Sequence, residues 1–349
     1  MNDDGPPSGL EVLAPLGWDD TWAEALVAVD PAAVPGRVLQ HHGAGLVLAL
    51  PTETRTVMFT HRLDPEPTVG DWVAVVAGEV ATVLPRRSLL RRRSPHGGEQ
   101  QLAANVDRLL LVCGLDRPVK DGRIQRGTAI AHDAGAEPVV VLTKAAREGS
   151  ADAKTAAAEV RAGNPGVPVV VASVKEGVGL EEISALIAHR TVTLLGESGA
   201  GKSSIVNALL GTEVVLTGDV RAGDAKGRHT TTNRELHLLA NGGVLIDTPG
   251  IREVGLVGET EAVEETFAEV SEVAETCRFS DCGHDTEPGC AVRAALDAGE
   301  LDPVRVERWK DLREETEAAQ VRSSPHERRR NDKRFARITK DAQKRKGRS

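Results

Sequence analysis

The residues best suited to chemistry lie at positions 196–204, in the run Gly-Glu-Ser-Gly-Ala-Gly-Lys-Ser-Ser. Glycines in such a run let successive backbone N–H groups converge on phosphate oxygens, the lysine reaches the terminal phosphates and the first serine ligates Mg²⁺. The run therefore predicts a phosphate-binding loop for a nucleoside triphosphate with Mg²⁺. Its nucleotide-binding residues would be Gly196, Glu197, Ser198, Gly199, Ala200, Gly201, Lys202, Ser203 and Ser204.

The segments around this loop must position it. Residues 191–195 are short, apolar and β-branched, which predicts a buried strand. Residues 204–210 predict the first turns of a helix, whose N-terminus adds partial positive charge. A glycine-rich turn with a chance lysine would match the pattern alone, but the strand–loop–helix context favours a nucleotide site.

Two further motifs downstream could hold Mg²⁺ and sense the γ-phosphate. Asp247 ends the apolar run 244–246 and begins Asp-Thr-Pro-Gly, so its carboxylate could hold Mg²⁺ through water and the Gly250 N–H could sense the phosphate. Residues 227–232 contain three threonines, of which Thr231 is our candidate for a hydroxyl ligand of Mg²⁺. A polar surface turn is the alternative for that segment.

The elements that recognise the base come before the phosphate loop. The apolar run 139–142 is followed by Thr143, Lys144, Ala145 and Ala146, in the form of a guanine-specificity element. Ala172 and Ser173, after another apolar run, resemble the element that supports the base. In an ordinary GTPase these elements follow the phosphate loop, so the order predicts a circular permutation.

Two positions depart from the GTPase pattern. Ala146 stands where a carboxylate normally accepts two hydrogen bonds from guanine, and its loss could cost on the order of 2–4 kcal/mol of guanine selectivity. Glu148 or Asp152 could replace that carboxylate. Ile251 stands where many GTPases orient water with glutamine, which predicts slow hydrolysis in isolation. His229 is a candidate for the missing group, and a structural histidine fits that position equally.

Three cysteines and a histidine form a second chemical cluster. Cys277, Cys282, His284 and Cys290 lie within 14 residues, and a zinc ion takes four such ligands in a tetrahedron. Four protein ligands close the coordination sphere, so the spacing predicts one structural Zn²⁺. Free cysteines beside a passing histidine are the alternative. The fourth cysteine, Cys113, lies in an apolar run and is interpreted as a buried hydrophobe.

The pattern of apolar runs predicts a multi-domain chain. Five short β-like runs between residues 35 and 85 predict a small OB-fold barrel, with or without a ligand. Apolar runs alternate with helical stretches from residue 107 to 257, which predicts a parallel α/β sheet with helices on both faces. We expect an N-terminal extension at 1–34, the barrel at 35–98, the permuted GTPase domain at 99–257, a mostly α zinc-binding domain at 258–320 and a basic tail at 321–349.

Charge and hydropathy bound the partners and the compartment. The net charge is −9, yet residues 321–349 carry 12 Lys/Arg and three acids. A basic tail on an acidic body indicates a polyanion such as RNA, with a solvated tail as the alternative. Five arginines within residues 86–93 suggest a phosphate-facing surface or a solvated linker. No stretch approaches the roughly 18 apolar residues of a membrane span and no apolar signal core is present, so we expect a cytoplasmic protein.

Together these motifs resemble the ribosome small-subunit-dependent GTPase A family, over nearly the whole chain. The resemblance implies a barrel, a permuted GTPase and a zinc domain, in a monomer that binds GTP and GDP. It also implies slow GTP hydrolysis, stimulation by the 30S subunit through contacts with 16S rRNA, and release after hydrolysis. Two other functions remain open at this point: a nucleotide-gated RNA-binding scaffold with negligible hydrolysis, and an NTPase of relaxed base specificity.

Overall fold

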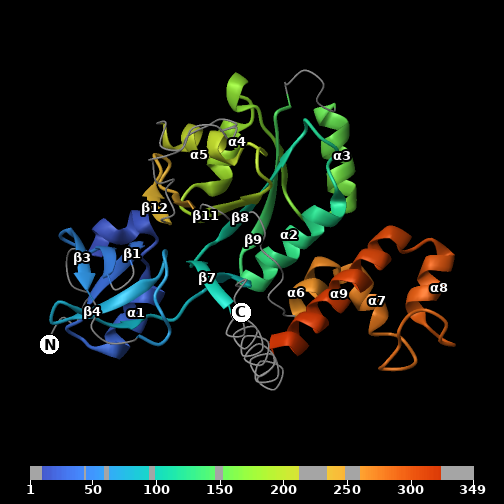
Figure 1. The fold of residues 1–349 in the computed structure, drawn as a ribbon, viewed down its shortest axis with the longest axis horizontal. Coiled ribbons are helices and arrows are strands. Elements are labelled where there is room, and N and C mark those ends of the chain that lie inside the picture. The colour runs from blue at the N-terminus through green and yellow to red at the C-terminus, as the bar shows by residue number, and fades with distance from the viewer. Residues whose placement is uncertain are drawn as a thin grey trace, which may run out of the picture. The chain divides into compact units, whose positions relative to one another are not determined.

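A computed structural model describes residues 10–42, 45–58, 63–93, 99–145, 152–211, 234–247 and 260–323 (Figure 1). The chain divides into two compact units. The first comprises residues 1–92 and 100–254, and the second residues 93–99 and 255–349. The predicted barrel and the α/β sheet both lie in the first unit, and the cysteine–histidine cluster lies in the second.

Five antiparallel strands form the N-terminal barrel. They are β1 (Val34–His42), β2 (Gly45–Ala49), β3 (Thr54–Met58), β4 (Trp72–Val76) and β5 (Glu79–Val83). Strand β1 pairs with β2 and β4, β2 pairs with β3, β4 pairs with β5, and β3 contacts β5. Alternate side chains such as Val38, Leu46 and Leu48 are fully buried inside, which is the pattern expected of a small closed sheet. The five predicted β runs therefore match five strands.

A short helical segment covers one side of the barrel. It consists of the 3₁₀ helix η1 (Leu10–Leu16) and helix α1 (Asp20–Val29), where the Asp19 carboxylate caps α1 by accepting the Trp22 N–H. Trp22 and Leu26 pack on Trp72 of β4 in one apolar cluster. The sequence pattern predicts a short helix over residues 18–29, and α1 covers most of that range.

The second part of the first unit is a six-stranded sheet in the order β10-β9-β8-β11-β13-β12. Five strands run parallel. They are β8 (Arg108–Gly114), β9 (Glu137–Thr143), β10 (Val169–Val171), β11 (Thr191–Gly196) and β13 (Val244–Asp247). These are the five apolar runs that predicted buried strands.

Strand β12 (Glu235–Leu238), which the sequence did not predict, is antiparallel to β13, so the sheet is mixed at this edge. A turn of a few residues joins the two strands, and only an antiparallel pair can be connected so tightly. Strand β12 also pairs with β1 at Gln40 and Glu235. The barrel and the α/β sheet are thus hydrogen-bonded into one continuous sheet.

Helices cover both faces of the α/β sheet, as predicted. The four are α2 (Asp121–Ala134), α3 (Ala153–Gly163), α4 (Leu180–Ile187) and α5 (Lys202–Leu210). Helices α4 and α5 pack on the face that carries Leu110 and Val112. Because successive strand residues point to opposite faces, Leu111 faces the other way, and it lies against Gly127 of α2.

The run of arginines leads into a two-stranded sheet of β6 (Leu89–Arg93) and β7 (Glu99–Ala104). Arg86 forms an ion pair with the buried Asp71 at 2.7 Å, and its side chain is only 11% exposed. Arg87 pairs with Asp19, and Arg91 pairs with Asp133. Arg86 therefore stabilises the fold through a buried carboxylate, whereas the prediction that the other arginines of the run face phosphates stays a prediction.

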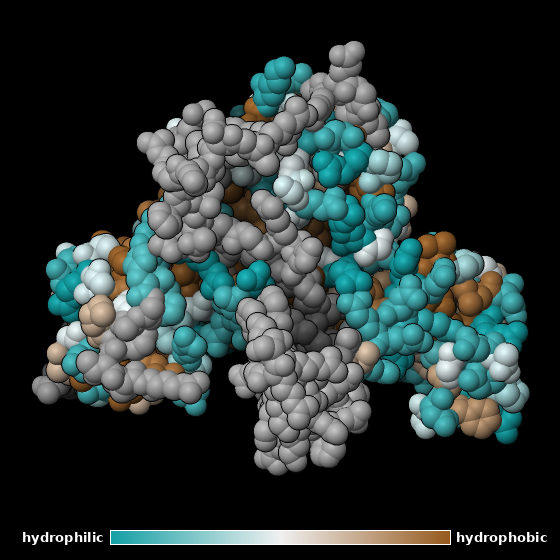
Figure 2. All heavy atoms as spheres, viewed as in Figure 1, coloured by the Kyte–Doolittle hydropathy of each residue, from teal (hydrophilic) through white to brown (hydrophobic). Residues whose placement is uncertain are grey.

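The second unit is helical, as predicted. It contains α6 (Thr260–Thr266), α7 (Ala268–Ala274), α8 (Ala291–Ala298) and α9 (Pro303–Ser323), packed around Phe267, Val292 and Trp309. In the view of Figure 2 the coloured surface is mostly hydrophilic, with smaller hydrophobic patches. Among the described residues no helix is both long and apolar enough to cross a membrane. The basic tail beyond residue 323 lies outside the described residues.

Candidate functional site

The phosphate loop connects the end of β11 to the start of α5. Gly199 and Gly201 have left-handed φ values of 75° and 99°, which glycine adopts without strain. Gly196 is needed for another reason, because a Cβ there would overlap the Val112 carbonyl oxygen of neighbouring β8. The α5 N-terminus, with Lys202, Ser203 and Ser204 in its first turn, directs its backbone N–H groups and its partial positive charge toward the loop.

The lysine of the loop is held in place by backbone. Its ammonium donates to the carbonyls of Gly196 at 2.5 Å and Glu197 at 2.7 Å. Glu197 in turn forms ion pairs with Arg123 at 2.8 Å and Arg117 at 3.5 Å. The sequence did not single out these two arginines, whose only signal is their place shortly after a buried strand.

Thr143 ties the predicted base-recognition element to the phosphate loop. Its hydroxyl donates to the Ala200 carbonyl at 2.5 Å and lies 3.3 Å from the Cys113 carbonyl. The loop, β8 and β9 thus meet at one buried hydroxyl. Cys113 beside it is largely buried, and this burial raises the pKa of its thiol to about 11, in keeping with its interpretation as a small hydrophobe.

The next residue, Lys144, has a left-handed φ of 62° and forms an ion pair with Asp116 at 2.6 Å. The hydrogen bond from Lys144 holds the pKa of Asp116 below its usual value, so the pair stays charged. Asp116 was missed from the sequence, although an aspartate just after a buried strand was a usable signal.

The structure brings the base elements and the phosphate loop to one edge of the sheet. Thr143 ends β9 and is followed by Lys144 and Ala145. Ala172 and Ser173 follow β10, and the loop lies at the end of β11, so all lie at carboxyl ends of parallel strands. Ligands of open α/β sheets bind at this edge. Ala172 and Ser173 are buried there. Ala146 and Glu148 lie outside the described residues. Asp152, the other proposed substitute, caps α3 by accepting from Thr155, so its carboxylate is already in use.

Asp247 is the last residue of β13, whose neighbour β11 leads into the loop. Burial raises the pKa of Asp247; Glu235 raises it further, while His237 and Lys202 lower it. A cation beside this carboxylate would favour its ionised form. Gly250, Thr231 and His229, the other predicted catalytic residues, lie outside the described residues.

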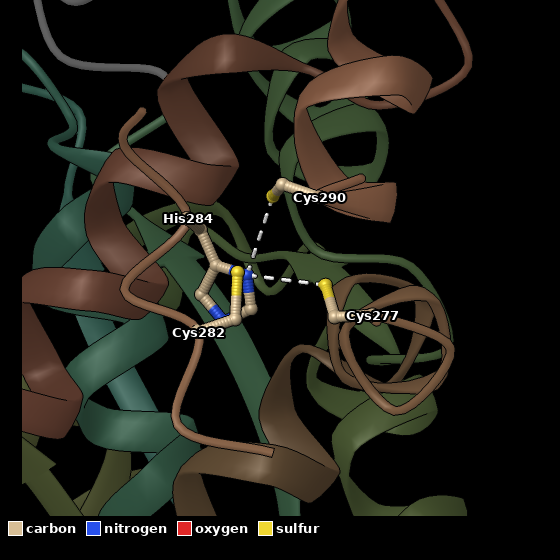
Figure 3. A group of neighbouring side chains, drawn as sticks. All are labelled: Cys277, Cys282, His284 and Cys290. Carbon is tan, nitrogen blue, oxygen red and sulfur yellow. Dashed lines mark hydrogen bonds between the residues drawn. The ribbon is translucent and has the colours of Figure 1, made fainter. Parts of the chain in front are cut away.

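The four predicted metal ligands converge in the second unit (Figure 3). Their ligand atoms all lie within 4.8 Å of one another. The Nδ1 atom of His284 lies 3.5 Å from the Cys277 sulfur and 3.7 Å from the Cys290 sulfur. Zinc–sulfur bonds of about 2.3 Å place tetrahedral ligands about 3.8 Å apart, so Cys277, Cys282, His284 and Cys290 could hold one zinc ion.

The surroundings of this cluster favour its metal-binding forms. The backbone N–H groups of Ala291 and Arg293, at the start of α8, point at the sulfurs of Cys277 and Cys290. Burial, with Lys310 and Arg313 nearby, lowers the pKa of His284, which favours the neutral imidazole that a metal requires. Lys310 also donates to the His284 carbonyl at 2.9 Å. These contacts orient the ligands from outside.

Comparison with known proteins decides the family. A family model described as RsgA GTPase matches residues 83–257, about half of the chain. A relative from Streptomyces coelicolor, named small ribosomal subunit biogenesis GTPase RsgA, is 43% identical over 324 residues, covering 89% of this chain and 88% of the relative. The chain belongs to the RsgA GTPase family. It is therefore a GTP hydrolase, and the resemblance inferred from its motifs is confirmed.

Other RsgA relatives and solved structures agree. A relative of the same name from Opitutus terrae is 44% identical over 342 residues, covering 90% of this chain and 92% of the relative. YjeQ from Thermotoga maritima superposes with a TM-score of 0.60 at 26% identity, covering 81% of this chain and 98% of that one. YloQ, described as a circularly permuted GTPase, gives a TM-score of 0.58 at 20% identity, covering 82% and 96%. The permuted fold is thus shared.

Proposed function

We propose that this GTPase binds the small ribosomal subunit, acts in its late assembly and hydrolyses GTP to GDP and phosphate faster when the subunit is bound. One observation supports this most strongly: Thr143, Lys202 and Asp247 gather at one sheet edge in the permuted order of a family whose relatives are named small ribosomal subunit biogenesis GTPases. We further propose contacts with 16S rRNA and a monomeric enzyme in the cytoplasm.

The residues of the phosphate loop would divide the work of binding. The loop N–H groups and the α5 N-terminus would bind the phosphate oxygens, and Lys202 would exchange its bonds to the Gly196 and Glu197 carbonyls for bonds to the terminal phosphates. Ser203 and Asp247 would hold Mg²⁺, which neutralises charge on the phosphates when it is bound. Thr231 and Gly250 complete the proposed set of catalytic residues.

We expect stimulation by a partner because Ile251 stands where many GTPases carry a water-orienting glutamine. Ile251 has no group that can hydrogen-bond water, so in-line attack on the γ-phosphate lacks an orienting side chain at that position. We propose that the isolated enzyme is slow and that the missing group comes from another loop of this chain or from the bound subunit. His229 is the residue of this chain that we would test first.

Base selectivity rests on a reduced set of contacts. Lys144 lies at the base edge and is fixed by Asp116, but Ala146 cannot accept hydrogen bonds from guanine. We propose that guanine is still preferred, by a smaller margin than a carboxylate would give. Competition between GTP and ATP for the purified enzyme measures that margin, and equal affinities would favour the relaxed NTPase.

The second unit is proposed to hold one structural zinc. Its four ligands would close the coordination sphere and leave no open position for a substrate. The metal would then serve folding and the shape of the unit, and phosphate chemistry would remain in the first unit.

Turnover with purified ribosomal subunits tests the proposed function. We expect small subunits to accelerate GTP hydrolysis by the wild-type enzyme, and large subunits to have no such effect. A Lys202→Ala variant with added small subunits controls for contaminating GTPases. Equal rates with and without small subunits would contradict the proposal. Binding to the small subunit without hydrolysis would favour the nucleotide-gated scaffold.

A further inference from the structure

A pocket of about 180 Å³ lies in the first unit, between the barrel and the amino end of β11. Its charged and polar lining includes Arg37, Arg87, Arg190, Asp107, Glu137 and Thr191. The phosphate loop follows the carboxyl end of the same strand, so about 20 Å of extended chain separates the two places. The pocket is therefore a different site from the nucleotide site.

A buried arginine forms part of its wall. Arg37, on β1, is 1% exposed, stacks over Trp72 at 5.0 Å and donates from Nη2 to the Thr191 hydroxyl at 3.3 Å. Its Nε has no hydrogen-bond partner among the described residues. Burial lowers the pKa of Arg37 to about 10, so the guanidinium remains charged at neutral pH. A buried charged donor of this kind favours an acceptor in the pocket.

Two more guanidinium groups belong to the lining. The Arg87 side chain lies over the Trp22 ring at 4.6 Å and is anchored by Asp19 at 2.7 Å. Arg190 directly precedes Thr191 and is exposed. The three arginines come from separate segments of the chain, and the fold brings them to one pocket.

The two acidic residues of the lining are engaged with the protein. The Asp107 carboxylate accepts the Thr191 N–H at 2.6 Å, and the Glu137 carboxylate pairs with Arg108 at 2.8 Å. With three arginines and two carboxylates, the lining carries a net charge of +1. Arginine's planar fork matches the oxygens of a phosphate, and its hydrogen bonds to anions are strong.

We propose that this pocket binds a phosphate group, held by Arg37, Arg87 and Arg190. Its volume is below the roughly 300–1,000 Å³ of sites for drug-sized ligands, so it suits inorganic phosphate or a phosphate with a small substituent. Because Thr191 begins the strand that leads into the phosphate loop, an occupant would link the barrel to the nucleotide-binding sheet.

Calorimetric titration of inorganic phosphate tests the site. The full-length protein is first saturated with a non-hydrolysable GTP analogue so that the phosphate loop is filled, and ionic strength is held constant with chloride. We compare the wild type with Arg190→Gln, Arg37→Lys and Arg55→Gln. Arg55 is a matched control because it is a half-exposed barrel arginine paired with Glu53, outside the pocket lining.

We expect the wild type and Arg55→Gln to bind phosphate equally, and Arg190→Gln and Arg37→Lys to bind it about tenfold more weakly. Equal binding by all four proteins, or no binding beyond that of chloride, would overturn the proposal. Arg190 is exposed, so its variant remains informative if Arg37→Lys fails to fold. Titration of a short oligouridylate distinguishes an RNA phosphate from a small-molecule phosphate. If Arg190→Gln weakens oligouridylate binding as much as it weakens the binding of inorganic phosphate, the pocket binds a phosphate of RNA. If Arg190→Gln weakens the binding of inorganic phosphate alone, the pocket binds a small molecule.

Discussion

The phosphate loop and the cysteine–histidine cluster are held in place in opposite ways. The loop is fixed by residues far away in the sequence: Thr143 bonds to Ala200 across 57 positions, and β8 packs against Gly196. The four ligands of the cluster lie within 14 residues, in the segment between the short helices α7 and α8. The loop is thus shaped by the hydrophobic core around it, whereas we predict that the cluster depends on a bound zinc ion for its shape.

The helices next to the cluster explain this difference. Helices α7 and α8 have 7 and 8 residues, and helices so short are unstable alone in water. Strands β8, β9 and β11, by contrast, are almost fully buried on both faces. Removing the metal from the cluster should therefore unfold the second unit, whereas a substitution in the phosphate loop should mainly alter function.

Removal of the metal should give the largest effect. Structural zinc contributes about 10–16 kcal/mol of apparent folding free energy in small metal domains. We expect a strong chelator, or Cys290→Ala, to unfold the second unit and leave GTP binding by the first intact. Circular dichroism measures the helix content of the protein. The zinc content reports whether the metal is bound, and the nucleotide affinity reports whether the first unit still binds GTP.

Cys113→Ala is the matched control for that experiment, because it removes a cysteine outside the cluster. It should keep the metal and the helices. Retention of full helicity by the metal-free protein would show that the cluster, like the loop, is shaped by its apolar neighbours.

Lys202→Ala should affect function more than folding. Loss of a positioned cation at the terminal phosphates should lower kcat/KM for GTP roughly 100-fold. Zinc content should not change, and Lys154→Ala, an exposed lysine on α3, should behave as wild type. Steady-state GTP hydrolysis with small subunits present measures the effect, and a decrease of less than threefold would contradict the assignment of Lys202.

Gly196→Ala should show that the core shapes the loop. Its Cβ would overlap the Val112 carbonyl oxygen, and such overpacking costs about 1–3 kcal/mol. Gly211→Ala separates this clash from backbone strain, because Gly211 has a φ of 68° but open space around it. Thermal unfolding of both variants compares the two costs, and a smaller loss for Gly196→Ala than for Gly211→Ala would refute the packing argument.

Thr143→Val should have a smaller effect. It removes the hydroxyl that bonds the Ala200 carbonyl and leaves that buried acceptor unpaired, which costs about 1 kcal/mol. We expect a few-fold weaker binding of GTP, with recovery in Thr143→Ser. Nucleotide titration measures the change. Identical GTP affinities of the Thr143→Val and Thr143→Ser variants would show that the Thr143 hydroxyl does not hold the loop.

Asp247→Asn should give the smallest change in the free energy of unfolding, and we expect this change to be an increase at neutral pH. Because the folded protein raises the pKa of Asp247, the ionised carboxylate destabilises the nucleotide-free fold as pH rises above the ordinary value of 3.8. The variant should therefore be more stable than wild type at neutral pH, by about 1 kcal/mol or less, and equal to it at low pH. Melting curves across pH, without nucleotide or Mg²⁺, test this, and a difference that grows as pH falls would contradict it.

Much of the fold could be predicted because its signals are local. Buried strands such as 139–142 are continuous apolar runs, and the barrel strands are short runs separated by turn residues. Strand β12 was missed because its Glu-Leu-His-Leu alternates over only four residues. The pairing of Arg86 with Asp71 was also missed, since a run of arginines looks the same whether it faces solvent or a buried carboxylate.

The sequence by itself determined the kind of phosphate loop, the permuted order of the motifs and the identity of four possible metal ligands, because residue type, order and spacing are linear information. Only the tertiary structure decided that Thr143 holds the loop, that Asp116 fixes Lys144 and that three arginines meet in one pocket. Such contacts depend on which strands become neighbours. Many sheet orders fit the same apolar pattern, and the packing of the whole core selects one of them.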